Sequence, residues 1–276
     1  MRHSVIVGVF VAVLVGCSEP AAGPEQTTTT SSVPPATPVS TTLPEMTTST
    51  EASTTEPDHL EVLVFHKTAG FRHDSIPAGM EAIDEMAATH GFSATATDDA
   101  SWLTEVGLAE YEVIVFLNTT GDILDRSQEQ ALESFIQSGK GFVGIHSATD
   151  TEYDWPWYGE LVGAYFEDHP APQAAAIDLV APDHPAARSL PVRFERFDEW
   201  YNFRSPPGAD LVVLATLDET SYEGGAMGDH HPIVWAHEYD GGRAFYTAGG
   251  HTIESFGEPL FRSHLADGIL WAAEGD

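Results

Sequence analysis

Near the start of its folded part the chain reads Glu61-Val62-Leu63-Val64-Phe65-His66, a short apolar run rich in β-branched residues. A continuous run of this length is typical of a strand that is buried on both faces of a sheet. Two more runs of the same kind follow, Val113 to Leu117 and Phe142 to His146. The sequence therefore predicts a sheet whose central strands are fully buried.

Helical patterns separate these runs. Ser75 and Pro77 open a stretch with apolar residues at helical spacing, and Gly91 is placed to end it. A second helix is expected to begin with a capping-box-like sequence, Asp125 to Gln128, and to end near Gly139. Strands and helices that alternate in this way predict an α/β fold, with a parallel doubly wound sheet and helices on both of its faces.

The rest of the chain is less regular, and no change in composition divides residues 59–276, which we take as one domain. Further strands are expected over residues 92–97, 175–180, 211–217, 233–237 and 244–247, and a closing helix over residues 259–273.

The N-terminus resembles a targeting signal. The apolar run Val5 to Val15 is too short to span a bilayer and ends in Leu14-Val15-Gly16-Cys17, which resembles a bacterial lipobox. We therefore expect residues 1–17 to be a lipoprotein signal peptide, with lipidation at Cys17. The protein would then be lipid-anchored at the bacterial cell envelope, outside the cytoplasm. An ordinary secretory signal with a chance cysteine is the alternative.

The composition of the next segment predicts a linker. Residues 18–58 contain 12 Thr, 6 Ser and 7 Pro, and no Lys, Arg or aromatic residue. Such a segment cannot bury enough apolar surface to offset the loss of chain entropy on folding. We expect it to be disordered and to hold the folded part away from the membrane.

Charge and cysteine content exclude several functions. With a formal net charge of −32, the protein would repel a phosphate backbone, so nucleic acid is excluded as a partner. Cys17 is the only cysteine, which excludes an intramolecular disulfide and leaves residues 59–276 without a cysteine nucleophile or a thiolate metal ligand.

Histidines and other polar residues directly follow the predicted strands. Ligands of an open parallel sheet bind beyond the carboxyl ends of its strands. His66 and the loop to His73 follow the first strand, Asn118 the third, His146 the fourth and His251 the last. We expect these side chains to meet at one rim of the sheet.

Two further clusters carry titratable groups. His169 lies in a turn beside two carboxylates, and Asp198 and Glu199 lie between aromatic residues. A carboxylate among apolar rings is expected to have a raised pKa and to serve as a general acid or base near neutral pH. An edge strand with alternating residues is the alternative for the second cluster. The pair His230-His231 lies in a Gly-rich loop and is expected to be solvated.

Several of these segments resemble the ThuA-like (trehalose utilisation) family, over about residues 60–273. The resemblance implies a class I glutamine amidotransferase-like fold, which is a flavodoxin-like three-layer architecture, and a role in carbohydrate metabolism. The motifs are Gly70-Phe71-Arg72-His73-Asp74-Ser75-Ile76, Gly141-Phe142-Val143-Gly144-Ile145-His146-Ser147, Phe166-x-x-His169-Pro170, Asp198-Glu199-Trp200-Tyr201 and Gly249-Gly250-His251.

The resemblance also excludes glutamine hydrolysis. In the amidotransferases a cysteine stands on a sharp turn after a strand, and here His146 holds the matching place after Val143-Gly144-Ile145. Imidazole cannot perform thiolate acyl chemistry. The segment His251 to Glu254 is one residue longer than the amidotransferase His-x-Glu pair.

We therefore expect a protein that processes a trehalose-like disaccharide or an oxidised (keto) sugar. The expected chemistry is proton abstraction beside a sugar carbonyl, with Glu199 or His146 as the base and Arg72 or an imidazole stabilising the oxyanion. Candidate catalytic residues are His146, Glu199, Asp198, His169, His251, Arg72 and His73. Candidate substrate-binding residues are Tyr201, Trp200, Trp155, Trp157 and Asn118, the aromatic ones as stacking faces or else as core or loop anchors.

Three alternatives stay open. A divalent metal held by some of His146, His169 and His251 with a carboxylate is one, although the chain has no short ligand motif. A non-catalytic sugar-binding lipoprotein that presents its ligand to a transporter or a partner enzyme is the second. A structural module with a solubilising acidic face is the third. The sequence does not indicate the oligomeric state.

Overall fold

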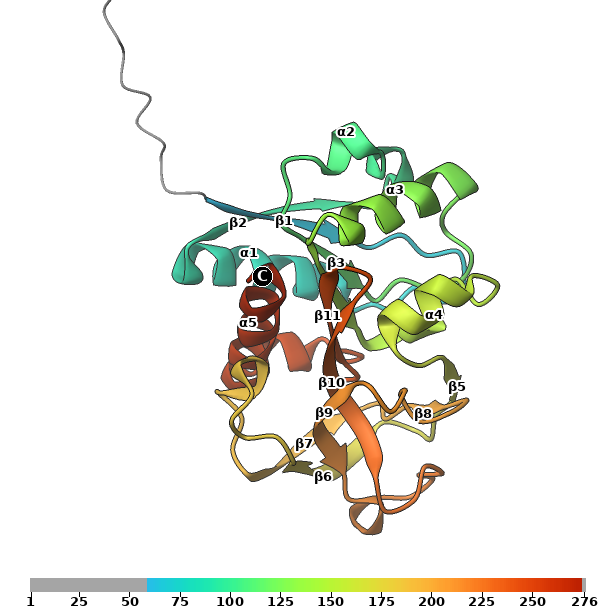
Figure 1. Ribbon diagram of the computed structural model, residues 1–276. Coiled ribbons are helices and arrows are strands. Elements are labelled where there is room, and N and C mark those ends of the chain that lie inside the picture. The colour runs from blue at the N-terminus through green and yellow to red at the C-terminus, as the bar shows by residue number, and fades with distance from the viewer. Residues whose placement is uncertain (1–58, 275–276) are drawn as a thin grey trace, which may run out of the picture. The chain divides into compact units, whose positions relative to one another are not determined.

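The predicted apolar runs are neighbouring strands of a nine-stranded sheet with the order β2-β1-β3-β4-β11-β10-β9-β6-β7. The computed structural model describes residues 59–274, shown as a ribbon in Figure 1. The expected signal peptide, the lipidation at Cys17 and the linker all lie outside the described residues. They stay predictions, as do the domain boundaries.

Five strands form the parallel part of the sheet, each parallel to its neighbours within this part. The side chains of β3 and β4 are completely buried, as expected for strands covered on both faces. The five strands are β1 (Leu60–Phe65), β2 (Phe92–Thr97), β3 (Val113–Leu117), β4 (Gly141–Ile145) and β11 (Gly242–Thr247).

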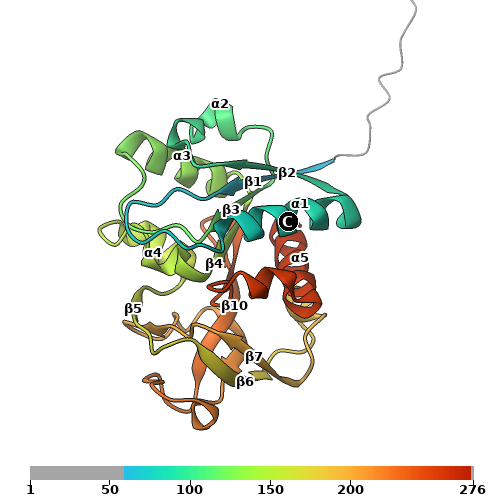
Figure 2. The same cartoon turned by 180° about the vertical axis from the view of Figure 1, so that it is seen from behind.

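Helices cover both faces of this part. On one face lie α1 (Ile76–His90) and α5 (Pro259–Ala273), and on the other α3 (Arg126–Gln137) and α4 (Pro156–Val162), as Figures 1 and 2 show. The short helix α2 (Glu105–Leu108) lies near α3. The expected α/β fold with a doubly wound sheet is confirmed.

The local signals for the first two long helices are also confirmed. Helix α1 ends at Gly91, whose φ of 79° is in the left-handed region that glycine adopts without strain. Helix α3 begins with a complete capping box, in which Asp125 and Gln128 each accept a hydrogen bond from the other residue's backbone N–H.

Antiparallel strands extend the sheet beyond β11. The sequence located three of them approximately but did not indicate their direction. The edge strand β7 was only the alternative interpretation of the segment at Asp198, and the sequence missed α4 and a separate two-stranded sheet. The antiparallel strands are β10 (His231–Tyr239), β9 (Val212–Leu217), β6 (Gln173–Leu179) and β7 (Arg193–Asp198), and the small sheet pairs β5 (Phe166–Asp168) with β8 (Asn202–Phe203).

The strand order reverses between β1 and β3, which is the switch point where ligands bind in such folds. The loops that follow strands of the parallel part are joined there. Ser75 Oγ donates to Gly250 O at 2.9 Å, and Asn118 Nδ2 donates to both Ser75 Oγ and Gly250 O at 3.0 Å. One hydrogen-bonded network therefore links the segments after β1, β3 and β11.

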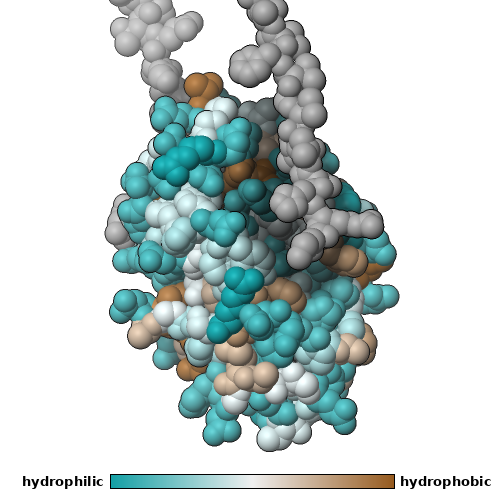
Figure 3. Space-filling model, turned by 90° about the vertical axis from the view of Figure 1, so that its right-hand side faces the viewer, coloured by the Kyte–Doolittle hydropathy of each residue, from teal (hydrophilic) through white to brown (hydrophobic). Residues whose placement is uncertain are grey.

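Polar residues dominate the visible surface (Figure 3). The face in Figure 3 is mainly hydrophilic, with scattered apolar residues. Among residues 59–274, no helix has both the length and the apolar character needed to cross a membrane.

Candidate functional site

A cavity of about 340 Å³ lies beyond the carboxyl ends of the parallel strands. The loops after β1, β4, β7 and β11 all contribute to it, so segments far apart in the sequence converge on one space. The lining residues are Phe71, His73, Asp150, Phe166, His169, Glu199, Tyr201 and His251.

Glu199 is the centre of the site, and its side chain is only 5% exposed. Its Oε2 lies 3.0 Å from His251 Nδ1 and 3.6 Å from His146 Nε2. Its Oε1 lies 3.0 Å from His169 Nδ1. The carboxylate thus contacts three imidazoles, two through one oxygen and one through the other.

The pKa of Glu199 is shifted in the direction opposite to the one expected from its aromatic neighbours. Burial raises this pKa, but the contacts with His146 and His251 outweigh burial and lower it to about 2. The expectation of a raised pKa is therefore wrong for Glu199, because imidazoles and not hydrocarbon surround the carboxylate. Glu199 is ionised at neutral pH.

The pKa shifts of two imidazoles differ in sign. Burial, followed by the charges of His146 and His251, lowers the pKa of His73 to about 3. Burial also lowers the pKa of His251, but contact with Glu199 prevails and raises it. At neutral pH His73 is therefore a neutral ring, whereas His251 lies where a positive charge is favoured.

His146 stands on a sharp turn directly after β4. It is completely buried, and its φ of 49° is in the left-handed region. Its Nδ1 lies 2.8 Å from the carbonyl oxygen of Ala248 and must donate to it. The other ring nitrogen, Nε2, faces Glu199 Oε2 at 3.6 Å. His146 thus stands on a sharp turn after a strand, as expected from the resemblance.

Asp198 lies behind the site and does not line the cavity, so we assign it a positioning role in place of the expected catalytic one. It is completely buried and accepts hydrogen bonds from Gly250 N at 2.8 Å and His251 N at 3.0 Å. Ser255 Oγ donates to it at 2.9 Å, and Arg196 Nη2 lies 3.4 Å away. Asp198 therefore fixes the backbone that carries His251.

Two polar candidates lie elsewhere. Arg72 is exposed, does not line the cavity and donates a hydrogen bond to the carbonyl of His66 at 3.5 Å. An oxyanion role for Arg72 is therefore not supported. Asn118 is completely buried and joins the network that links the rim loops, so it positions the rim and does not contact the cavity.

The three tryptophans do not present stacking faces to the cavity. Trp200 is completely buried and donates its indole N–H to Gln173 O at 2.9 Å. Trp155 and Trp157 stack on each other with ring centroids 5.1 Å apart, and neither lines the cavity. Of the aromatic candidates, only Tyr201 lines it.

Sequence reasoning missed three residues of the cavity wall, Phe71, Phe166 and Asp150. Phe71 is 67% exposed and contacts the His73 ring edge-on at 4.9 Å. Its place in the loop after the first strand was the available signal. Asp150 follows His146 by four residues, and burial raises its pKa.

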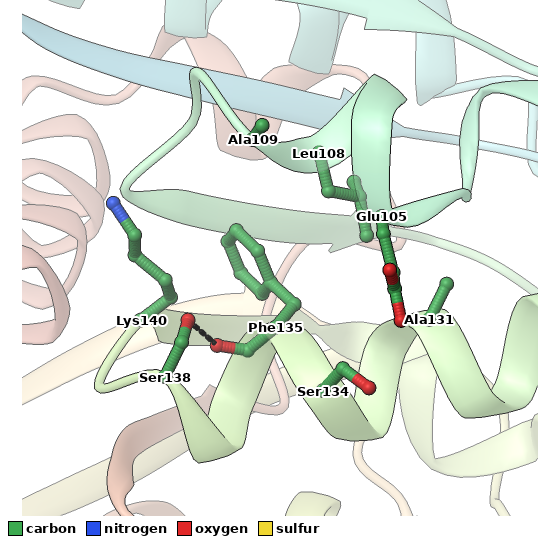
Figure 4. Close-up of a pocket in the computed structure, with 8 residues that line it drawn as sticks. All are labelled: Glu105, Leu108, Ala109, Ala131, Ser134, Phe135, Ser138 and Lys140. Carbon is green, nitrogen blue, oxygen red and sulfur yellow. Dashed lines mark hydrogen bonds between the residues drawn. The ribbon is translucent and has the colours of Figure 1, made fainter.

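A second hollow, between α2 and α3, lacks the converging polar groups of the cavity around Glu199. A space of about 150 Å³ between α2 and α3 is lined by small, apolar and hydroxyl side chains together with Glu105 and Lys140. Figure 4 shows these two charged residues on opposite sides of the hollow. Polar groups therefore do not converge there as they do around Glu199.

Comparisons with known proteins identify the family. The chain matches the ThuA family model, described as trehalose utilisation, over residues 61–272. The chain belongs to the ThuA family. No curated protein matches it.

Solved structures share the ThuA fold at low sequence identity. A ThuA-like protein from Bacteroides uniformis has a TM-score of 0.68 and 23% identity, and covers 79% of this chain and 92% of its own. A ThuA-like protein from Parabacteroides merdae has a TM-score of 0.65 and 16% identity, with coverages of 78% and 90%. A β-galactosidase from Bacillus circulans has a TM-score of 0.50 and 12% identity, covering 78% of this chain but 30% of its own.

Proposed function

We propose that this ThuA-family protein is a carbohydrate-processing enzyme that binds a trehalose-like disaccharide, or its keto derivative, in the cavity around Glu199. The family description, trehalose utilisation, supports this substrate class. The observation that carries the proposal is the convergence of a buried, ionised carboxylate and several imidazoles on one cavity. Such a set can move a proton without a cysteine nucleophile.

His169 is the best placed base. Its Nδ1 lies 3.0 Å from Glu199 Oε1 and 3.0 Å from Pro170 O, so Nδ1 carries the proton and Nε2 keeps its lone pair. The ring is 39% exposed and lines the cavity, so a ligand can reach it. Glu199 then orients the base, in the same way that a carboxylate orients a catalytic histidine in hydrolase triads.

The proposed step is proton abstraction from the carbon beside a sugar carbonyl. The C–H electron pair becomes the enolate double bond, the carbonyl oxygen takes the negative charge, and His169 holds the proton. Burial raises the pKa of the Tyr201 hydroxyl well above its usual value, so this group stays protonated and can donate a hydrogen bond to the oxyanion. Phe71 and Phe166 supply apolar walls for the ring.

The test follows exchange of the proton beside the carbonyl. Wild-type protein and Glu199→Gln are incubated with a keto derivative of trehalose in D2O, and deuterium incorporation is measured by NMR. We expect the wild type to catalyse the exchange and Glu199→Gln to slow it by about 10²–10⁴-fold, with affinity for the sugar within a few-fold. Tight binding without exchange by the wild type would favour the alternative, a sugar-binding protein that presents its ligand to a transporter or a partner enzyme.

We also propose that the domain acts at the cell envelope, tethered through a lipidated Cys17 and residues 18–58. The lipobox-like sequence supports this proposal. In a bacterial host, Cys17→Ala should move the protein from the membrane fraction to a soluble one. If the wild type itself is found in the soluble fraction, the anchor is rejected.

A further inference from the structure

Two buried ring nitrogens of the site have no hydrogen-bond partner among the described residues, His146 Nε2 and His251 Nδ1. Both lie close to Glu199 Oε2, but neither contact is aligned as a hydrogen bond. Buried polar atoms are nearly always satisfied in native proteins, so two unsatisfied nitrogens beside one carboxylate oxygen need an explanation.

A third imidazole completes the group. The ring of His73 lies 4.8 Å from that of His146 and 5.1 Å from that of His251, measured between centroids. The rings of His146 and His251 are 5.3 Å apart. His73, His146, Glu199 and His251 each offer one ligand atom, and these four atoms lie within 4.8 Å of one another.

These separations suit a small cation. Ligand atoms bound tetrahedrally to a zinc-type ion at about 2.0–2.1 Å are about 3.3 Å apart. The two contacts of Glu199 Oε2, at 3.0 Å and 3.6 Å, lie on either side of this value. Small side-chain movements would therefore bring the ligands to bonding distance.

The surroundings orient the ligands. His146 donates its Nδ1–H to Ala248 O at 2.8 Å, which leaves Nε2 as a free ligand atom. His169 contacts the oxygen of Glu199 that does not face His146 and His251. Asp198 accepts from the backbone N–H of His251 at 3.0 Å. Such outer contacts orient metal ligands and are a regular part of metal sites.

We propose that His73, His146, His251 and Glu199 bind one divalent transition-metal ion of the zinc type at the floor of the cavity. Three imidazoles and one carboxylate favour such ions over Mg²⁺ and Ca²⁺, which require mostly oxygen ligands. Three of the four residues line the cavity, so the ion would face a bound ligand. The inference rests on the unsatisfied nitrogens and their spacing, and it holds whether or not the substrate is a sugar.

Metal titration of the full chain tests the proposal. Protein stripped with a chelator is titrated with Zn²⁺ by calorimetry and with Co²⁺ by visible absorption, in 0.3 M NaCl to suppress binding to the acidic surface. We expect one equivalent to bind. His146→Gln and Glu199→Gln should each weaken binding by at least about a hundredfold, since each removes a ligand. The controls His90→Gln and Glu81→Gln, at exposed positions on α1, should bind as the wild type does.

Variant folding is checked by circular dichroism. His251→Gln is the second test variant, because its side chain is 24% exposed and the substitution disturbs packing least. One equivalent that is lost in folded His251→Gln supports the site even if His146→Gln unfolds. Binding that persists in both His251→Gln and Glu199→Gln, or absence of binding by the wild type, overturns it. The proton-exchange assay is separate, so failure of the sugar proposal leaves this result intact.

Discussion

Two imidazole–carboxylate clusters of the same domain differ in how their ring nitrogens are used. In the cluster of β10, His231 is completely buried, with Nδ1 2.8 Å from Glu219 Oε1 and Nε2 2.8 Å from the carbonyl oxygen of Tyr201. In the cluster around Glu199, His146 and His251 each keep one nitrogen without a hydrogen-bond partner among residues 59–274. Both ring nitrogens of His231 have partners within the described residues. The two nitrogens beside Glu199 are left able to bind a ligand.

The difference teaches that residue type alone does not distinguish a structural histidine from a functional one. The Gly-rich surroundings of His231 predicted a solvated ring, and that expectation is wrong, because Glu219 and Tyr201 O satisfy both of its nitrogens in the interior. Hydrogen-bond satisfaction separates the clusters, since a ring with both nitrogens bonded stabilises the fold and has no atom left for a ligand.

The largest expected effect is a loss of proton exchange on substitution in the cluster around Glu199, but not in the cluster around His231. His251→Gln should slow proton exchange by about 10²-fold or more, because it disrupts the group around Glu199, while the domain stays folded. His231→Gln should lower the free energy of unfolding by about 1–3 kcal/mol, because buried partners lose their bonds, and exchange should stay within about threefold. Equal losses of exchange in both variants would end the distinction.

The second largest expected effect is a loss of stability when Asp198 is replaced. Asp198→Ala should lower the free energy of unfolding, measured in urea, by about 3–5 kcal/mol, because it removes the buried partner of Arg196 and the acceptor of Gly250 and His251 N–H groups. The matched control is Asp178→Ala, whose carboxylate pairs with the exposed Arg193 and should contribute little. If the two variants are equally stable, Asp198 does not hold the loop.

The buried ring of His264 leads to a prediction about the pH dependence of stability. His264 Nδ1 has no hydrogen-bond partner among the described residues either, but the ring is not part of the group around Glu199. Burial, with a smaller contribution from Arg196, lowers the pKa of His264 to about 3. The folded protein therefore keeps this ring neutral, while the unfolded chain binds a proton below about pH 6.5.

Stability should thus be lost as the pH falls from about 6.5 toward 3, because the unfolded state binds more protons in this window. Between pH 7 and pH 5 the contribution of His264 is about 2 kcal/mol. Urea unfolding at both pH values should show that His264→Gln removes this part of the pH dependence. An unchanged slope would mean that His264 is not neutral in the folded state.

The smallest effect concerns the cavity mouth. Phe71→Ala should raise the KM for the sugar by about threefold to tenfold, because an exposed ring that stacks on a ligand contributes about 0.5–1.5 kcal/mol. The value of kcat should stay within about twofold, since Phe71 bears no titratable group. Val106→Ala, a still more exposed apolar control on α2, should change neither constant.

The sequence predicted most of the parallel part because its signals are local. The buried runs, the capping box at Asp125 and Gln128, and the glycine that ends α1 depend only on neighbouring residues. It offered an edge strand only as the alternative for the segment at Asp198, because Phe194 and Phe197 are three residues apart and lack the two-residue period of a strand. It could not give the direction of the strands beyond β11. Strand direction depends on pairing between distant segments.

The site was predictable where topology alone places residues. His73, His146 and His251 follow parallel strands, and the sheet rule brings such positions together. The roles of Trp200 and Asn118 depended on partners far away in the chain, Gln173 for the first and Ser75 and Gly250 for the second. No local pattern shows such partners.

The network of Ser75, Asn118 and Gly250 has a thermodynamic consequence for ligand binding. Because it joins segments after β1, β3 and β11, the groups at the rim are held in place before any ligand arrives. Association then loses little conformational entropy from loop ordering. Calorimetry of a bound ligand should accordingly give a heat-capacity change that matches the apolar surface covered at the mouth, without the larger change that accompanies coupled folding.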